Sequence, residues 1–145
     1  MRYAILTLLA CSALLGGDPK PKKPRLDLKA MPKMGNPPLS IHLVAELVGG
    51  QDLEEWYCPE IVWGFGDDAD QSVQEPECAP FCAGTRIERQ FTADHEYSEP
   101  GTHSVTVTLR HKGETLAVRS VSVLVVPLTH VFIGKRDPRP MPSPL

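Results

Sequence analysis

Strict alternation of apolar and polar side chains is the feature that most constrains how this chain can fold. Residues 39–47 and 103–110 both alternate with a period of two, which is the pattern of a strand with one buried face and one wet face. β-Branched and aromatic runs at residues 61–65 and 115–126 predict two more strands, the second one after a glycine-containing hairpin. The sequence therefore predicts an all-β chain.

Weaker patterns complete this prediction. Residues 26–30 suit a polar edge strand, residues 86–91 suit a short strand, and residues 51–57 could make one helical turn. Short strands separated by turn signals are typical of a small antiparallel, immunoglobulin-like β-sandwich. The side chains expected in its core are Trp63, Phe65, Tyr97, Val105 and Val107.

Proline and charge separate the two ends of the chain from its middle. Most of the 15 prolines lie outside residues 39–126. Residues 18–35 carry six basic and two acidic side chains (+4), whereas residues 36–130 carry five basic and fifteen acidic ones (−10). We therefore expect a linker at residues 18–36, a sandwich at 26–126 whose edge strand overlaps it, and a disordered Pro-rich tail at 127–145. An acidic domain repels phosphate backbones, so nucleic-acid binding is not expected.

The first 17 residues have the pattern of a secretory signal peptide. Arg2 precedes an apolar run of about 15 residues, too short to span a bilayer comfortably. Two processing outcomes stay open: cleavage near Ala13, or lipidation of Cys11, because residues 8–11 resemble a bacterial lipobox. We expect an exported bacterial protein that is periplasmic, secreted or lipid-anchored, with no other contact with the membrane.

Export decides how the cysteines are interpreted. In an oxidising compartment Cys58 should be bridged to Cys78 or to Cys82, which leaves one thiol over. The alternative is a zinc-like set of three thiolates with His95 or His103, but it requires a reducing compartment and lacks a Cys-x-x-Cys pair. The disulfide is the favoured hypothesis.

Three blocks of sequence carry a resemblance to a known family. Residues 35–39 (GNPPL), 62–67 (VWGFGD) and 95–107 (HEYSEPGTHSVTV) resemble, in order and spacing, the PKD domain, an immunoglobulin-like extracellular module. Gly64 and Asp68 depart from its usual pattern, which has Asp and Gly at these positions. The resemblance implies contact with protein or glycan outside the cell. The residues that carry the structural motif are Trp63, Phe65, Gly66, Asp67, His95, Tyr97, Pro100 and Gly101.

Sites for chemistry are few. Asp67, Asp68 and Asp70 could supply oxygen ligands to calcium, although the chain has no EF-hand spacing. His95 with Asp94 and a nearby serine could be drawn as a triad, but a chain with this many Ser and Asp residues allows such a drawing by chance. The other histidines, His103 among them, are expected on the surface. We therefore expect no cofactor and no enzymatic activity.

Three classes of function follow from this reading. A non-catalytic binding or spacer module at the cell envelope accounts best for the export signal, the sandwich and the tails. A calcium-dependent adhesion module is the alternative, and a small secreted enzyme or inhibitor comes third.

We also predict that the hydroxyl group of Tyr97 bonds to a backbone group, an arrangement known as a tyrosine corner. This role is structural.

Overall fold

The computed structural model describes residues 20–69 and 71–128. These residues form strands and one short 3-10 helix, η1 (Glu54–Trp56). The described residues contain no helix that is long and apolar enough to cross a membrane. The strands are β1 (Arg25–Met31), β2 (Met34–Gly35), β3 (Leu39–Val48), β4 (Glu60–Gly64), β5 (Ser72–Gln74), β6 (Gln90–Tyr97), β7 (Gly101–His111) and β8 (Glu114–Val125).

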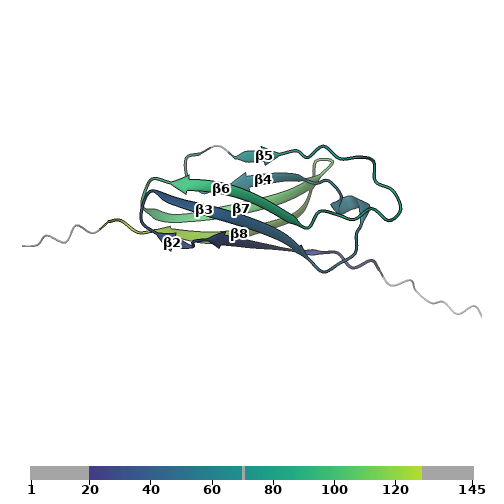
Figure 1. Cartoon of the computed structure of the whole chain (residues 1–145), viewed down its shortest axis with the longest axis horizontal. Coiled ribbons are helices and arrows are strands. Elements are labelled where there is room, and N and C mark those ends of the chain that lie inside the picture. Colours follow the sequence, from purple (N-terminus) through teal and green to yellow (C-terminus); the bar gives the residue numbers. More distant parts are fainter. Residues whose placement is uncertain (1–19, 70, 129–145) are drawn as a thin grey trace, which may run out of the picture.

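Two sheets form the layers of a β-sandwich, as predicted (Figure 1). Sheet A has the strand order β1-β3-β6, and sheet B has the order β2-β8-β7-β4-β5. All neighbouring strands are antiparallel except β2, which runs parallel to the end of β8. The chain thus leaves sheet A after β1, joins sheet B at β2, and returns to sheet A at β3.

The core lies between the sheets and is filled by the inward residues of the alternating strands. In β3 the buried positions are every second residue from Leu39 to Leu47, as the period of two predicts. The five side chains expected in the core are all buried: Trp63, Phe65, Tyr97, Val105 and Val107. Trp56 of η1 adds a large side chain that the sequence patterns did not assign to the core.

The edge strand expected at residues 26–30, where the sandwich overlaps the linker, is present as β1, and contact with the sandwich already begins at Lys22. Lys22 accepts a backbone hydrogen bond from Gln51 (2.9 Å), and the next residues lead directly into β1. β1 pairs with β3 along its full length because Leu26 and Ala30 can be buried on one side of it. The burial of these apolar side chains outweighs the tendency of the surrounding prolines and lysines to stay extended and solvated.

β6 is the strand for which the sequence prediction was weakest. A strand was expected at residues 86–91, whereas β6 begins at Gln90 and ends at Tyr97. Its outward positions include Asp94 and Glu96, and such charged residues lower β-propensity. Pairing with β3 overrides this local preference. The predicted signal peptide with Cys11, the tail from residue 129, and Asp70 lie outside the described residues.

Candidate functional site

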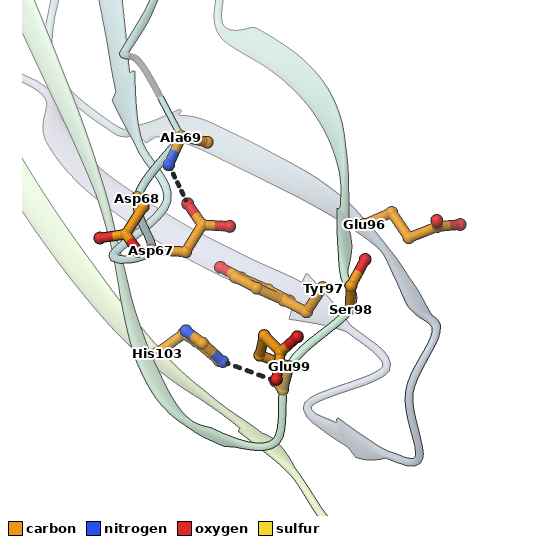
Figure 2. Close-up of a pocket in the computed structure, with 8 residues that line it drawn as sticks. All are labelled: Asp67, Asp68, Ala69, Glu96, Tyr97, Ser98, Glu99 and His103. Atoms are coloured by element: carbon orange, nitrogen blue, oxygen red, sulfur yellow. Dashed lines mark hydrogen bonds between the residues drawn. The ribbon is translucent and has the colours of Figure 1, made fainter.

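The motif residues meet at one end of the sandwich. Phe65, Gly66 and Asp67 follow β4, His95 and Tyr97 end β6, and the turn at residues 98–100 leads into β7. Residues that are about 30 positions apart in sequence therefore share one corner, which we call the β4–β6 corner. Figure 2 shows Tyr97 lying between Asp67 on one side and Ser98 on the other, with His103 below.

Asp67 and His95 form a close polar pair in this corner. His95 Nε2 lies 2.6 Å from Asp67 Oδ2, and the backbone N–H of Ala69 donates to Asp67 Oδ1 at 3.2 Å. Burial alone would raise the pKa of Asp67, but the hydrogen bonds from His95 and Ala69, together with the charge of His95, hold it below its ordinary value. Because Asp67 is ionised at neutral pH, Nε2 of His95 is the donor.

His95 is also one of four rings that pack in a row. The His95 ring lies flat on Phe65, with centroids 3.9 Å apart and planes within 4°. His95 meets Tyr97 edge to face at 4.7 Å, and Tyr97 stacks on His103 at 4.2 Å. Such contacts add to the energy of area burial. They fix the imidazole of His95 in an orientation from which it reaches Asp67.

Tyr97 closes the corner from inside. Its hydroxyl donates to the carbonyl oxygen of Phe65 at 2.6 Å, which is the backbone contact expected of a tyrosine corner. Burial first, and the charge of Asp67 second, raise the pKa of Tyr97 to about 12. The phenol therefore keeps its proton and stays a hydrogen-bond donor at any physiological pH. This side chain ties the end of β4 to the end of β6.

Gly66 makes the close approach of the strands possible. Its φ of 74° lies in the left-handed region, which favours glycine. A Cβ at this position would come within 2.6 Å of the backbone oxygen of Ser104 on β7. Backbone cannot move aside as a flexible side chain can, so no other residue fits here.

His103 is the residue that the sequence prediction misplaced. A surface position was expected, but only 9% of the residue is exposed. Its Nε2 lies 3.2 Å from the Glu99 carbonyl oxygen, and its Nδ1 lies 3.4 Å from the Gly66 carbonyl oxygen. The sequence could have predicted its burial, because His103 lies two and four residues before Val105 and Val107 and therefore faces the same side of β7.

A hollow of about 310 Å³ opens at this corner. Asp67, Asp68, Glu96 and Glu99 contribute to its lining, and Tyr97 and His103 form its inner wall (Figure 2). The triad drawn from the sequence does not form, because His95 pairs with Asp67 while Asp94 pairs with His42 at 2.7 Å. The polar groups of the corner are therefore engaged in holding the fold.

The structure gives the calcium hypothesis little support. Asp67, which is more buried than Asp68, already binds His95 and Ala69. Within residues 20–69 and 71–128, no group of three or more His, Cys, Asp or Glu side chains is placed to hold a metal ion. Asp70 lies outside the described residues.

Cys58, Cys78 and Cys82 lie at the opposite end of the sandwich, near the start of β4 and in the loop between β5 and β6. Cys58 is bridged to Cys78, with Cα atoms 6.1 Å apart, and Cys82 is free and exposed. Of the two pairings left open by the sequence, the structure therefore contains the one with Cys78. The three-thiolate zinc set is excluded, because two of its sulfurs are bonded to each other.

The loop that carries Cys78 is also held by an aromatic side chain near the bridge. The Tyr57 hydroxyl donates to the carbonyl oxygen of Ala79 at 2.8 Å, and its ring packs against Phe81 with centroids 5.3 Å apart. We call residues 75–89 the bridged loop.

Comparison of the structure with solved structures identifies the fold. One similar structure is the PKD domain of an M14-like peptidase from Thermoplasmatales archaeon SCGC AB-540-F20, with a TM-score of 0.50 over 73% of this chain and 98% of that one. The fold is that of a PKD domain. Sequence identity to the archaeal domain is 11%, so the similarity concerns the fold alone. No family model matches the sequence, and no curated protein matches it.

Proposed function

We propose that this chain is a non-catalytic, extracytoplasmic binding or spacer module at the cell envelope, which contacts protein or glycan. The observation that carries the proposal is the set of hydrogen bonds in the β4–β6 corner. Asp67 and His95 bond to each other, Asp67 also accepts from the Ala69 backbone, and Tyr97 donates to the Phe65 backbone. Among the described residues, neither Asp67 nor His95 forms a hydrogen bond with a serine, threonine or cysteine side chain that could serve as a nucleophile.

The bridge between Cys58 and Cys78 supports placement outside the cytoplasm. Disulfides persist in oxidising compartments and are rare where thiol reductants are abundant. The apolar run after Arg2, with its small residues, supplies the route of export. In the archaeal protein the same fold is a domain of an M14-like peptidase, and we infer that here, too, it serves as an accessory to function rather than as a catalyst.

Fractionation of an exporting bacterial host, with intact-mass analysis of the product, tests this proposal. We expect the protein in the periplasm, the medium or the envelope, either cleaved near Ala13 or carrying lipid on Cys11. If Cys11 is lipidated, Cys11→Ser should release the protein from the detergent phase, and Cys82→Ser is the matched control that should not. Full-length, unprocessed protein in the cytosol would contradict the proposal.

A calcium titration separates the proposal from the adhesion alternative. A binding or spacer module of the kind proposed keeps its melting temperature when calcium replaces a chelator. A calcium-dependent rise in melting temperature that disappears in Asp68→Asn would favour the adhesion module instead.

A further inference from the structure

One edge of sheet A has no strand paired with it among the described residues. β6 pairs with β3 on one side, and β6 is the last strand of the sheet. Leu47 N–H donates to the Arg89 carbonyl oxygen at 2.8 Å, which fixes the alternation of the antiparallel ladder. The odd-numbered residues of β6 therefore bond to β3. The residues whose backbone N–H and C=O point outward are Gln90, Thr92, Asp94 and Glu96.

A side-chain contact confirms this direction. Gln74 of β5 donates from Nε2 to the carbonyl oxygen of Thr92 at 3.4 Å, across the side of the sandwich where both sheets end. Among the described residues, no backbone group elsewhere in the chain forms a hydrogen bond with an outward group of β6. An eight-residue strand whose outward backbone groups have no backbone partner is a template for another strand, and at Thr92 the added strand would replace the Gln74 side chain.

The other strand edges of the sandwich differ from β6 in length or in charge. At β1, the outward carbonyl of Leu26 accepts a hydrogen bond from Arg119 Nε of β8 at 2.9 Å. β1 itself carries Arg25 and Lys29. β8 pairs with β2 only at its last two residues, but its exposed side chains include Arg119, and β5 has only three residues. β6 is the edge strand whose charged side chains are all acidic, so it is the one we consider for an added basic strand.

Acidic side chains lie at both ends of this edge. In the second half of β6, Asp94 and Glu96 are exposed, and they contact His42 (2.7 Å) and Ser40 (3.0 Å) of β3. Figure 2 shows Glu96 pointing away from His103. A second hollow, of about 350 Å³, lies at the start of β6 and is lined in part by Glu75 and Glu88. β6 itself contains no Lys or Arg, and neither do the linings of the two hollows.

We propose that the open edge of β6 binds an extended basic peptide, which joins sheet A as a fourth strand. Backbone hydrogen bonds would supply affinity, and lysine or arginine side chains beside Asp94 and Glu96 would supply specificity. A second copy of the chain fits poorly, because pairing two β6 edges would bring like charges together. This inference rests on the binding role proposed above and gives that role a partner class.

Binding of a defined peptide to the purified full chain tests the proposal. The probe is a capped peptide of four Lys-Thr repeats, and amide hydrogen exchange is followed by NMR. We expect at least tenfold slower exchange at residues 92, 94 and 96, and little change at 91, 93 and 95, which already bond to β3. Protection elsewhere, or no binding at millimolar peptide, would overturn the proposal.

Two matched controls separate strand addition from simple charge attraction. Asp94→Lys with Glu96→Lys should weaken binding at least tenfold, whereas Glu54→Lys with Glu114→Lys changes the net charge equally and should leave affinity within about threefold. A peptide methylated at every second backbone nitrogen should bind at least tenfold more weakly. Equal binding by the methylated peptide would overturn the proposal, and the export test would be unaffected.

Discussion

The two ends of the sandwich are held together by different physical means. At the β4–β6 corner, buried polar and aromatic groups converge without any covalent link. At the other end the bridged loop is exposed for most of its length, and it is anchored by one disulfide and by Tyr57 (Figure 1). The corner is fixed by packing and buried hydrogen bonds, whereas the loop, which buries little apolar surface, is stabilised by a covalent link that lowers the entropy of the unfolded chain.

Trp63→Ala should lower the unfolding free energy more than any other change proposed here. Trp63 lies on β4, which runs from the bridged end to the β4–β6 corner, and its side chain is part of the core that both ends share. Trp63 is 0% exposed, and truncation of such a side chain costs about 3 to 5 kcal/mol of unfolding free energy. Urea denaturation followed by circular dichroism measures this loss. Val118→Ala, at a position 50% exposed, is the control. A loss below about 1 kcal/mol for Trp63→Ala would contradict the assignment of Trp63 to the shared core.

Removal of the bridge tests the covalent end. Cys58→Ala with Cys78→Ala opens a loop with a sequence separation of 20 residues, and the chain-entropy model predicts a loss of about 3 kcal/mol. Cys82→Ala, which removes only the exposed thiol, should stay within about 0.5 kcal/mol of the wild type. Peptide mapping without reduction should recover the Cys58–Cys78 pair. A Cys58–Cys82 peptide would show that the bridge is misassigned.

Substitution of one glycine at each end, Gly66 in the corner and Gly84 in the bridged loop, allows the stability of the two ends to be compared directly. Gly66→Ala should cost about 2 kcal/mol or more, since the new Cβ would meet the backbone of Ser104 in a left-handed conformation. Gly84 of the bridged loop has a similar φ of 86° but open space around it. Gly84→Ala should therefore cost only about 1 kcal/mol, the conformational part of the penalty. Equal losses in thermal or urea unfolding would remove the distinction between a packed corner and an open loop.

The smallest expected effect is a pH dependence confined to the corner. The pKa of Asp67 is held below its ordinary value of 3.8 in the folded state. The resulting stabilisation is fully present above about pH 4 and is lost as the pH falls through the folded pKa. Asp67→Asn should therefore flatten the fall in unfolding free energy below pH 4, measured by urea titrations at several pH values. Equal slopes for the variant and the wild type would show that another group controls this region.

The corner was more predictable from sequence than the rest of the site. Period-two alternation fixed which residues of β3 and β7 face inward, and the spacing of the three motif blocks pointed to a tyrosine corner. The partner of His95 could not be predicted, because Asp67 lies 28 residues away in sequence. Only the packing of sheet A against sheet B brings His95, on β6, next to Asp67, which follows β4.

The other outcomes have particular causes. His103 was assigned to the surface by residue type, although its parity on β7 placed it with the buried valines. The edge strand expected at residues 26–30 is confirmed as β1, although only two of its seven positions are buried. The sequence left the choice between Cys78 and Cys82 open, because it depends on the path of the bridged loop, which local patterns do not encode.

The path of the chain through the sandwich bears on how such a unit can be used. The first described residues lie at one end of the long axis and the last ones at the other (Figure 1). A 12-residue strand such as β8 covers about 40 Å at the usual rise per residue. A domain whose chain ends lie at opposite ends of its long axis lengthens a polypeptide along that axis, whereas a domain with adjacent ends would project to one side. Such a domain therefore adds its own length to the distance between the segments that flank it.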